Sequence, residues 1–354
     1  MQSHARAHAT RITLALATLV ALAACNSDDN TGLGNGTNAF TVTRLVASPS
    51  GPTAQNTDAD LVNAWGIAFA PSGNVWVADN HTGMSTVYDP TTGVKQSAIA
   101  IGALSAGEPT GVVYNGTSDF SIGLNGPATF IYAGEDGRIN AWNSALGGTA
   151  IRVASHAGAV YKGIALASLG TGSSLLFATD FHNKAVDVYD AQFNLVNSFT
   201  DPDLPDGYAP FGVQHVDGHV WVTFAQIDPA NPDDDKPGAG AGIVDIFSYD
   251  GSVASRFATG GALNAPWGIA VAPSGFGSFG DRILIGNFGD GRIAVYTPTG
   301  QFVTYLHDAA GADISIDGLW GIAFGPGTDN STTLYFAAGP NDEAQGLMGT
   351  ITPK

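Results

Sequence analysis

Oxygen-bearing side chains recur in this chain at one kind of place, just after short apolar runs such as Val75-Trp76-Val77-Ala78. Carboxylate and amide oxygens are the ligands that Ca²⁺ prefers, and the ion takes six to eight of them. Converging side chains of this kind predict a divalent-cation site that polarises a carbonyl group and activates water. The candidate metal ligands are Asp79, Asn80, Glu135, Asp180, Asn287 and Asn341.

The same residues have a simpler interpretation. An Asp at the end of a strand often accepts hydrogen bonds from the backbone amides of the tight turn that follows. Recurrence at several places favours this alternative for any single acid, because a catalytic residue needs to occur only once. For the polar surface as a whole, cation binding and turn capping both stay open, and Ca²⁺ is the only cofactor that the chain suggests.

Large aromatic side chains form a second recurrent set, each directly before a glycine. A ring of their faces would stack on a sugar or another flat ligand, with two histidines from the polar turns beside it. The alternative is packing between repeats, which bury their cores against their neighbours; recurrence favours packing. The candidate ligand-binding residues are Trp65, Phe211, Trp267, Trp320, His81 and His182.

These residues belong to a repeat that occurs six times. The glycine of the repeat lies at positions 66, 111, 163, 212, 268 and 321, about 50 residues apart. Each copy continues with a second apolar run, a polar turn and two further short apolar segments, without helical periodicity. Four short antiparallel strands every ~50 residues are typical of a β-propeller blade. The glycine is expected where first strands crowd together around the central channel.

The chain is therefore predicted to be an all-β, six-bladed β-propeller over residues 39–354. The last copy ends after three strands, at Gly349-Thr350-Ile351-Thr352. The missing fourth strand is predicted to be residues 40–46, Phe40 to Val46, which precede the first copy. Pairing of this strand with the last blade closes the ring and removes both sheet edges.

The pattern Trp-Gly-Ile-Ala, Pro-Ser-Gly, Val-Trp-Val-Ala-Asp and Val-Tyr-Asp in the first copy resembles the NHL-repeat class of six-bladed propellers. Residues 40–354 also resemble a family of exported bacterial propellers that is described only as uncharacterised. Leu61 to Ala68 is the most family-like segment. The resemblance implies the fold and almost nothing about activity.

The first 25 residues predict export and lipidation. Arg6 and Arg11 precede an apolar run from Ile12 to Leu22, which is typical of a secretory signal and too short to span a bilayer. Leu22-Ala23-Ala24-Cys25 resembles the lipobox of bacterial lipoproteins, which implies a signal peptide at 1–24 and acylation of Cys25. Residues 25–38 read as a polar, flexible tether. Asn26 after the cysteine favours the outer membrane over the inner one, on its periplasmic or surface side.

The net negative charge of the chain argues against one class of function, nucleic-acid binding. Residues 1–24 hold two arginines and no acid, so the mature chain has 11 basic and 31 acidic residues and a net charge near −20. Such a chain repels nucleic acid, and no nucleic-acid partner is expected. The longest insertion, residues 226–241, holds three consecutive aspartates and is predicted to overhang the acidic face as a solvated loop.

The sequence leaves two functions open. The favoured one is a monomeric, non-enzymatic binding or scaffolding module that is anchored to the membrane and presents its acidic loops to a protein or a glycan. The alternative is a metal-dependent hydrolase similar to lactone-hydrolysing propellers. Those enzymes place a metal-binding Glu at the start of the first blade, where this chain has Asn63, and Glu108 in the second blade is an imperfect substitute.

Overall fold

The computed structural model describes residues 37–354 except 72, 103–107, 171 and 326–331. The predicted signal peptide, Cys25 and the tether up to residue 36 lie outside the described residues. Within these described ranges, no helix is long and apolar enough to span a membrane. The described helices are short 3-10 turns, namely η1 (Asn80–Thr82), η2 (Gly123–Asn125), η3 (Ser144–Leu146) and η4 (Gly277–Phe279).

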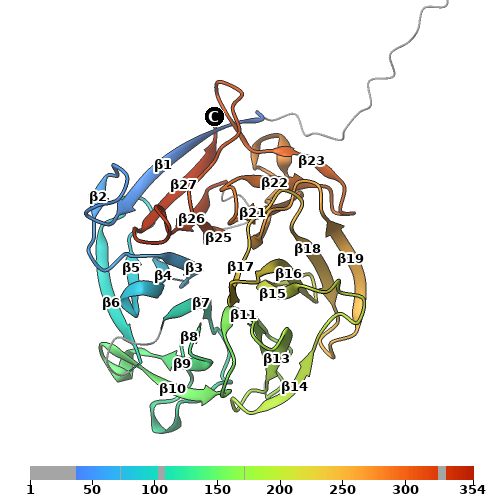
Figure 1. The fold of residues 1–354 in the computed structure, drawn as a ribbon. Helices are drawn as coiled ribbons and strands as arrows, with labels where there is room; N and C mark the ends of the chain where they lie inside the picture. The colour runs from blue at the N-terminus through green and yellow to red at the C-terminus, as the bar shows by residue number, and fades with distance from the viewer. Residues whose placement is uncertain (1–36, 72, 103–107, 171, 326–331) are drawn as a thin grey trace, which may run out of the picture. The chain divides into compact units, whose positions relative to one another are not determined.

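The strands form six blades of four antiparallel strands, as predicted (Figure 1). Blade 1 consists of β3 (Ala64–Phe69), β4 (Val75–Asp79), β5 (Met84–Tyr88) and β6 (Lys95–Ile101). Blade 2 consists of β7 (Pro109–Tyr114), β8 (Phe130–Gly134), β9 (Arg138–Trp142) and β10 (Thr149–Ser155). Blade 3 consists of β11 (Tyr161–Ala167), β12 (Leu175–Asp180), β13 (Ala185–Tyr189) and β14 (Leu195–Phe199).

The second half of the chain repeats this order. Blade 4 consists of β15 (Tyr208–Val216), β16 (His219–Asp228), β18 (Ile243–Phe247) and β19 (Val253–Thr259). Blade 5 consists of β20 (Pro266–Val271), β21 (Ile283–Asn287), β22 (Ile293–Tyr296) and β23 (Phe302–Tyr305). Blade 6 consists of β25 (Leu319–Phe324), β26 (Leu334–Ala338), β27 (Leu347–Pro353) and β1 (Ala39–Ala47).

The N-terminal strand closes the ring, which confirms the sequence prediction. β1 pairs antiparallel with β27, with Val42 opposite Ile351, and becomes the outer strand of blade 6. Figure 1 shows this as the blue β1 beside the red β27. Two short strands, β2 (Asn56–Thr57) and β24 (His307–Asp308), pair in parallel with the two ends of β1. The last blade is therefore built from both ends of the described chain.

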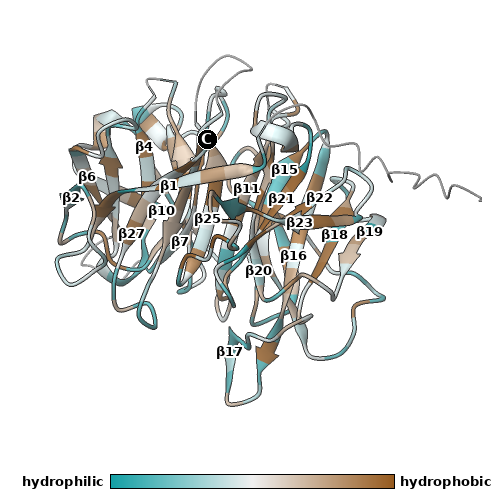
Figure 2. Ribbon diagram, turned by 90° about the horizontal axis from the view of Figure 1, so that it is seen from above, coloured by the Kyte–Doolittle hydropathy of each residue, from teal (hydrophilic) through white to brown (hydrophobic). Residues whose placement is uncertain are grey.

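The repeated glycine has the steric role that the sequence predicts. The first strands contact one another in the cyclic order β3, β7, β11, β15, β20, β25 and back to β3. A Cβ added at Gly66 would lie 2.8 Å from the backbone nitrogen of Val112 in the next blade, and one at Gly321 would lie 2.5 Å from the carbonyl oxygen of Trp65. A side chain at these positions would push neighbouring blades apart. Between the blades, buried apolar residues of adjacent sheets form the core, and Figure 2 shows apolar colour along many of the strands.

Candidate functional site

One end of the central channel carries a connected set of acidic and amide side chains around a buried lysine. The loops that lead into the first strands and the loops between second and third strands meet here, as in other propellers. We call this set the mouth network. Its members are Asn63, Asn80, Glu135, Lys162, Asp234, Asp235 and Glu343.

Lys162 is the cation of the mouth network. It is the third-blade counterpart of the aromatic residues that precede the repeated glycine, and it is 3% exposed. Its Nζ donates to Glu135 Oε1 at 2.6 Å and lies 3.6 Å from Asp234 Oδ1. Its ammonium group also lies 5.4 Å from the centroid of the Trp65 ring. Burial acts to lower the pKa of Lys162, but the charges of Glu135 and Asp234 outweigh it and raise the pKa, so the side chain stays protonated.

Two asparagines connect the carboxylates of neighbouring blades. Asn80 Nδ2 donates to Glu135 Oε2 at 2.9 Å. Asn63 Nδ2 donates to Glu343 Oε2 at 2.5 Å and to Asn80 Oδ1 at 3.3 Å. Asn63 Oδ1 accepts from the Trp320 indole nitrogen at 3.0 Å, which anchors the network to the aromatic core. The network therefore spans residues from blades 1, 2, 3, 4 and 6.

Two carboxyl groups of the mouth network hold protons near neutral pH. Burial, with a further contribution from the charge of Asp234, raises the pKa of Glu343 to about 7 and that of Asp235 to about 8. Asp235 is 7% exposed, and its Oδ2 is buried without a hydrogen-bond partner among the described residues. Perturbed carboxyl groups of this kind cluster at functional sites.

The turn that carries Glu343 is strained. Asn341, Asp342 and Glu343 have φ angles of 58°, 48° and 63°, three consecutive non-glycine residues in the left-handed region. Each such residue costs about 1 kcal/mol or more. Backbone strain that persists is typical of binding and catalytic sites. Here it brings the Glu343 side chain against Asn63.

The acidic insertion reaches the mouth, as predicted, but it is not simply a solvated loop. It forms β17 (Asn231–Asp235), which pairs with the end of β16. Figure 1 places β17 near the middle of the ring, and Figure 2 shows the hairpin extending beyond the strands on one face. Asp233 accepts from His182 at 2.5 Å, and Asp234 faces Lys162. The aspartate run is therefore held against the mouth by its contacts with His182 and Lys162.

The predicted aromatic ring fills the channel. Trp65 stacks on Trp320 at a centroid distance of 3.7 Å, and Trp320 stacks on Phe288 at 3.9 Å. Trp65, Phe211 and Trp320 are at most 2% exposed, whereas Trp267 is partly exposed and donates its indole N–H to the Lys162 carbonyl oxygen. This arrangement is the one expected if the aromatic residues serve to pack the repeats against one another. The faces of Trp65, Phe211 and Trp320 are covered, so they offer no open stacking surface.

The candidate histidines lie on the same face but in different contacts. His81 Nε2 is 3.4 Å from Asn63 Nδ2, at the edge of the mouth network. His182 is half-exposed and pairs with Asp233 of the insertion; this hydrogen bond raises the pKa of His182.

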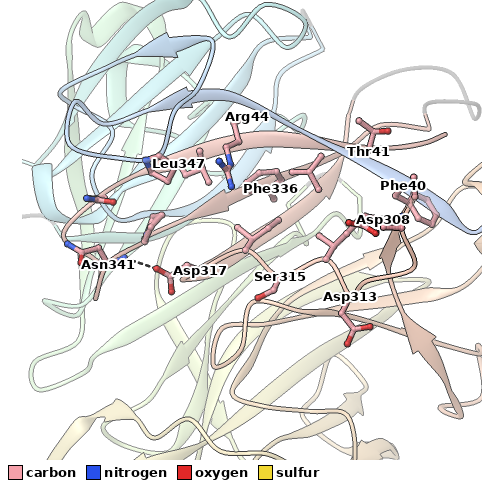
Figure 3. Close-up of a pocket in the computed structure, with 18 residues that line it drawn as sticks. Phe40, Thr41, Arg44, Asp308, Asp313, Ser315, Asp317, Phe336, Asn341 and Leu347 are labelled. Carbon is pink, nitrogen blue, oxygen red and sulfur yellow. Dashed lines mark hydrogen bonds between the residues drawn. The ribbon is translucent and has the colours of Figure 1, made fainter.

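Of the six predicted metal ligands, Asn80 and Glu135 are joined in the mouth network, while the other four contact residues outside it. Asp79 Oδ2 accepts from the Thr86 amide of the next strand, and Asn287 Oδ1 accepts from the Asn264 amide. Asp180 accepts from the Asn183 amide, the turn-capping role that the sequence left open. Asn341 lines a groove of about 780 Å³ between β1, β27 and residues 308–317. Its backbone amide donates to Asp317 there (Figure 3). The six residues therefore do not form one calcium site.

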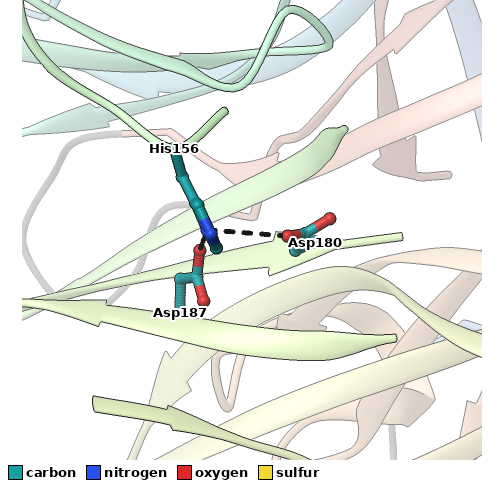
Figure 4. A group of neighbouring side chains, drawn as sticks. All are labelled: His156, Asp180 and Asp187. Atoms are coloured by element: carbon teal, nitrogen blue, oxygen red, sulfur yellow. Dashed lines mark hydrogen bonds and ion pairs between the residues drawn. The ribbon is translucent and has the colours of Figure 1, made fainter. Parts of the chain in front are cut away.

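Asp180 also belongs to a different group that could bind a metal. His156, Asp180 and Asp187 each offer a ligand atom, and these atoms all lie within 4.8 Å of one another (Figure 4). In the described part of the chain this is the one cluster of three or more acidic, histidine or cysteine side chains with such spacing.

Sequence reasoning placed Lys162 and Glu343 on the acidic loop face without giving them a role, and it missed His156, Asp187 and the strand within the insertion. Two signals were available. Lys162 is a cation at a repeat position that is aromatic in four blades, and Asp187 is an acid inside the apolar third strand Ala185–Tyr189. The contact of Glu343 with Asn63 carried no sequence signal, because it joins residues 280 positions apart.

Comparison with known proteins supports the fold and one family relationship. No family model matches the chain. "Uncharacterized protein R648" of Acanthamoeba polyphaga mimivirus is 30% identical over 315 residues, which cover 84% of this chain and 76% of the viral protein. This chain belongs to the family of that viral protein. A second family member from the same virus, "Uncharacterized protein L690", is 29% identical over 84% of this chain and 82% of its own length.

Solved structures share the propeller fold with this family at low identity. A virginiamycin B lyase from Staphylococcus aureus matches with a TM-score of 0.51 and 15% identity, over 89% of this chain and all of the lyase chain. A gluconolactonase from Xanthomonas campestris matches with a TM-score of 0.54 and 13% identity, over 83% of this chain and 87% of its own. At such identity these similarities concern the fold and not the chemistry.

Proposed function

We propose that this chain is an envelope-anchored binding module whose mouth network binds a cationic group of a protein partner. The observation that carries the proposal is the charge imbalance of the mouth. The carboxyl groups of Glu135, Asp234, Asp235 and Glu343 surround a single ammonium group, that of Lys162. A lysine or arginine side chain that enters the mouth displaces the protons of Asp235 and Glu343 and gains two carboxylates as partners.

The partner in this proposal is a basic protein segment rather than a glycan. The aromatic faces that would stack on a sugar are buried, whereas the carboxylates of Glu135 and Asp234 are partly exposed. The net charge of −18 also attracts basic partners over a distance and speeds their association.

The hydrolase alternative needs a divalent ion with an open coordination position at the mouth. Lys162 argues against such an ion, because its ammonium group already bonds to Glu135 and faces Asp234. The binding module is therefore the better-supported function.

Calorimetry with an oligolysine peptide tests this proposal directly. Binding at pH 6.5 is expected to release protons, which is measured by repeating the titration in buffers of different ionisation enthalpy. Glu343→Gln and Asp235→Asn should each reduce the proton release, and Asp203→Asn, a change at an exposed acid elsewhere, should not. Absence of binding, or proton release that is unchanged in both mouth variants, would contradict the proposal; saturable Ca²⁺ binding with lactone hydrolysis would favour the alternative.

The anchor is a separate part of the proposal and rests on the Leu22-Ala23-Ala24-Cys25 motif. We propose acylation of Cys25 and placement at the outer membrane. In Gram-negative cells grown with an azide-tagged fatty acid, the wild-type chain should be labelled and found in the outer-membrane fraction, and Cys25→Ser should be unlabelled. A labelled Cys25→Ser chain would overturn the assignment.

A further inference from the structure

Two buried carboxylates and one imidazole meet where blade 2 leads into blade 3 (Figure 4). Asp180 is the last residue of β12, and Asp187 lies in β13 opposite Ala178, so both aspartates are on the same face of the sheet. His156 follows β10 directly. Its Nδ1 is 2.7 Å from Asp187 Oδ2 and 3.9 Å from Asp180 Oδ2.

This carboxylate pair has no permanent counter-ion. Both aspartates are fully buried, and in the described part of the chain neither forms an ion pair with a lysine or an arginine. Asp187 Oδ1 is buried without a hydrogen-bond partner among those residues. A buried, unpaired charge costs several kcal/mol, so a pair of carboxylates in this setting favours binding of a cation.

Blade 4 shows how the same chain neutralises such a pair with its own residues. Asp245 is the third residue of β18, as Asp187 is of β13, and Asp245 accepts from Arg256 at 2.8 Å. The same guanidinium group bonds to Asp201, so one arginine serves two carboxylates. Blade 3 has two carboxylates in a comparable setting but only His156 in place of the arginine.

Hydrogen bonds from neighbouring residues fix the two aspartates of the blade 3 group in place. Tyr161 donates its hydroxyl to Asp187 Oδ2 at 2.7 Å and is itself within 2.6 Å of the Tyr189 hydroxyl. Asp180 Oδ1 accepts from the amides of Val160 and Asn183. Supporting hydrogen bonds of this kind orient the ligands of metal sites and increase their affinity. The His156 side chain is 35% exposed, which leaves a route for an ion and a place for a water ligand.

We infer that His156, Asp180 and Asp187 bind a divalent transition-metal ion of the Zn²⁺ class. One imidazole nitrogen and two carboxylate oxygens are a donor set for such ions, whereas Ca²⁺ and Mg²⁺ prefer oxygen alone. Three protein ligands at 2.0–2.2 Å with water in the fourth position give a tetrahedral site with one exchangeable ligand. Binding of the ion requires the His156 ring to turn away from its 2.7 Å contact with Asp187, and the 35% exposure of the side chain leaves room for this change.

Titration with Co²⁺ tests the inference, because the ion has a visible absorption spectrum that reports its coordination. The whole chain is used with Cys25→Ser, which removes the thiol as a competing ligand. We expect one Co²⁺ per chain, displaced by one equivalent of Zn²⁺. His156→Gln and Asp187→Asn should each weaken binding at least tenfold.

Two matched variants serve as controls. His182→Ala removes the exposed imidazole that pairs with Asp233, and Glu135→Gln alters the mouth network. Both should bind Co²⁺ like the parent chain, and circular dichroism checks that each variant is folded without metal. Absence of saturable binding by the folded parent chain, or binding that is unchanged in folded His156→Gln, overturns the inference. Loss of binding in Glu135→Gln with retention in His156→Gln would overturn it as well, by placing the ion in the mouth.

Discussion

Blades 3 and 4 place an aspartate at the same position of the third strand but neutralise it differently. Asp245 of blade 4 bonds to Arg256, and Asp187 of blade 3 bonds to His156. An arginine is charged at every accessible pH, whereas an imidazole is charged only when it is protonated. A buried pair of carboxylates therefore does not by itself indicate a ligand site, and the counter-ion of the pair has to be identified first. Where the chain supplies a permanent cation, the pair is structural, and where it does not, the pair is a candidate ligand site.

The largest expected effect comes from opening the ring that holds both blades in place. Deletion of residues 39–47 removes β1, the outer strand of blade 6, and exposes β27 as an unpaired edge. We expect loss of the cooperative unfolding transition in calorimetry. Deletion of residues 1–36 is the matched control and should leave that transition in place. A soluble chain that lacks residues 39–47 and melts at an unchanged temperature would contradict closure of the six-bladed ring by β1.

Removal of the permanent cation of blade 4 should cost more than removal of the imidazole of blade 3. Arg256→Met leaves Asp201 and Asp245 without a cationic partner, and we expect a loss of about 2–3 kcal/mol of unfolding free energy, below the full cost for a buried pair because Arg256 is partly exposed. His156→Gln without metal should cost about 1 kcal/mol. Urea unfolding measures both. Equal losses would remove the distinction between the two blades.

Addition of Zn²⁺ should stabilise only the chains in which His156, Asp180 and Asp187 are all present. At 100 times its dissociation constant, an ion that binds only the folded state adds about 2.7 kcal/mol. The parent chain and Arg256→Met should both melt at a higher temperature with Zn²⁺, and Asp187→Asn should not. A shift of equal size in Asp187→Asn would show that the ion binds elsewhere.

A smaller effect than that of Arg256→Met is expected from the mouth network, as a dependence of stability on pH. Glu343 and Asp235 have pKa values near 7 and 8, above their unfolded values, so the folded state holds more protons between about pH 4 and 8. Stability should fall as pH rises through this window, by about 1–2 kcal/mol, because Glu343 is partly exposed and Asp234, Glu135 and Lys162 also face these groups. Combining Glu343→Gln with Asp235→Asn should flatten that contribution. A pH profile identical to that of the parent chain would contradict the assigned pKa values.

The fold was predictable because its determinants are local and repeated. The six glycines mark the crowded first strands, and the missing strand of the last copy predicts the pairing of β1 with β27. The positions of the loops within a blade predict which face of the propeller carries the acidic side chains. Residues 226–241 lie between two strands of one blade, and this position predicts that they overhang that face.

The site was less predictable because its contacts join distant residues. Asn63 meets Glu343, and Trp267 bonds to the Lys162 carbonyl across the ring. Neither contact follows from spacing within one repeat. The aspartates at strand ends looked alike in sequence, and only the partners of Asp79 and Asp180 distinguish a backbone cap from a member of a cluster.

The most direct test of the account is an anomalous difference map from crystals of the Cys25→Ser chain soaked in Zn²⁺ and measured on both sides of the zinc absorption edge. We predict one strong peak between His156, Asp180 and Asp187, with none beside Lys162 or Arg256. A peak within the mouth network and none in blade 3 would contradict it, because the chain would then bind its ion where it already supplies its own cation.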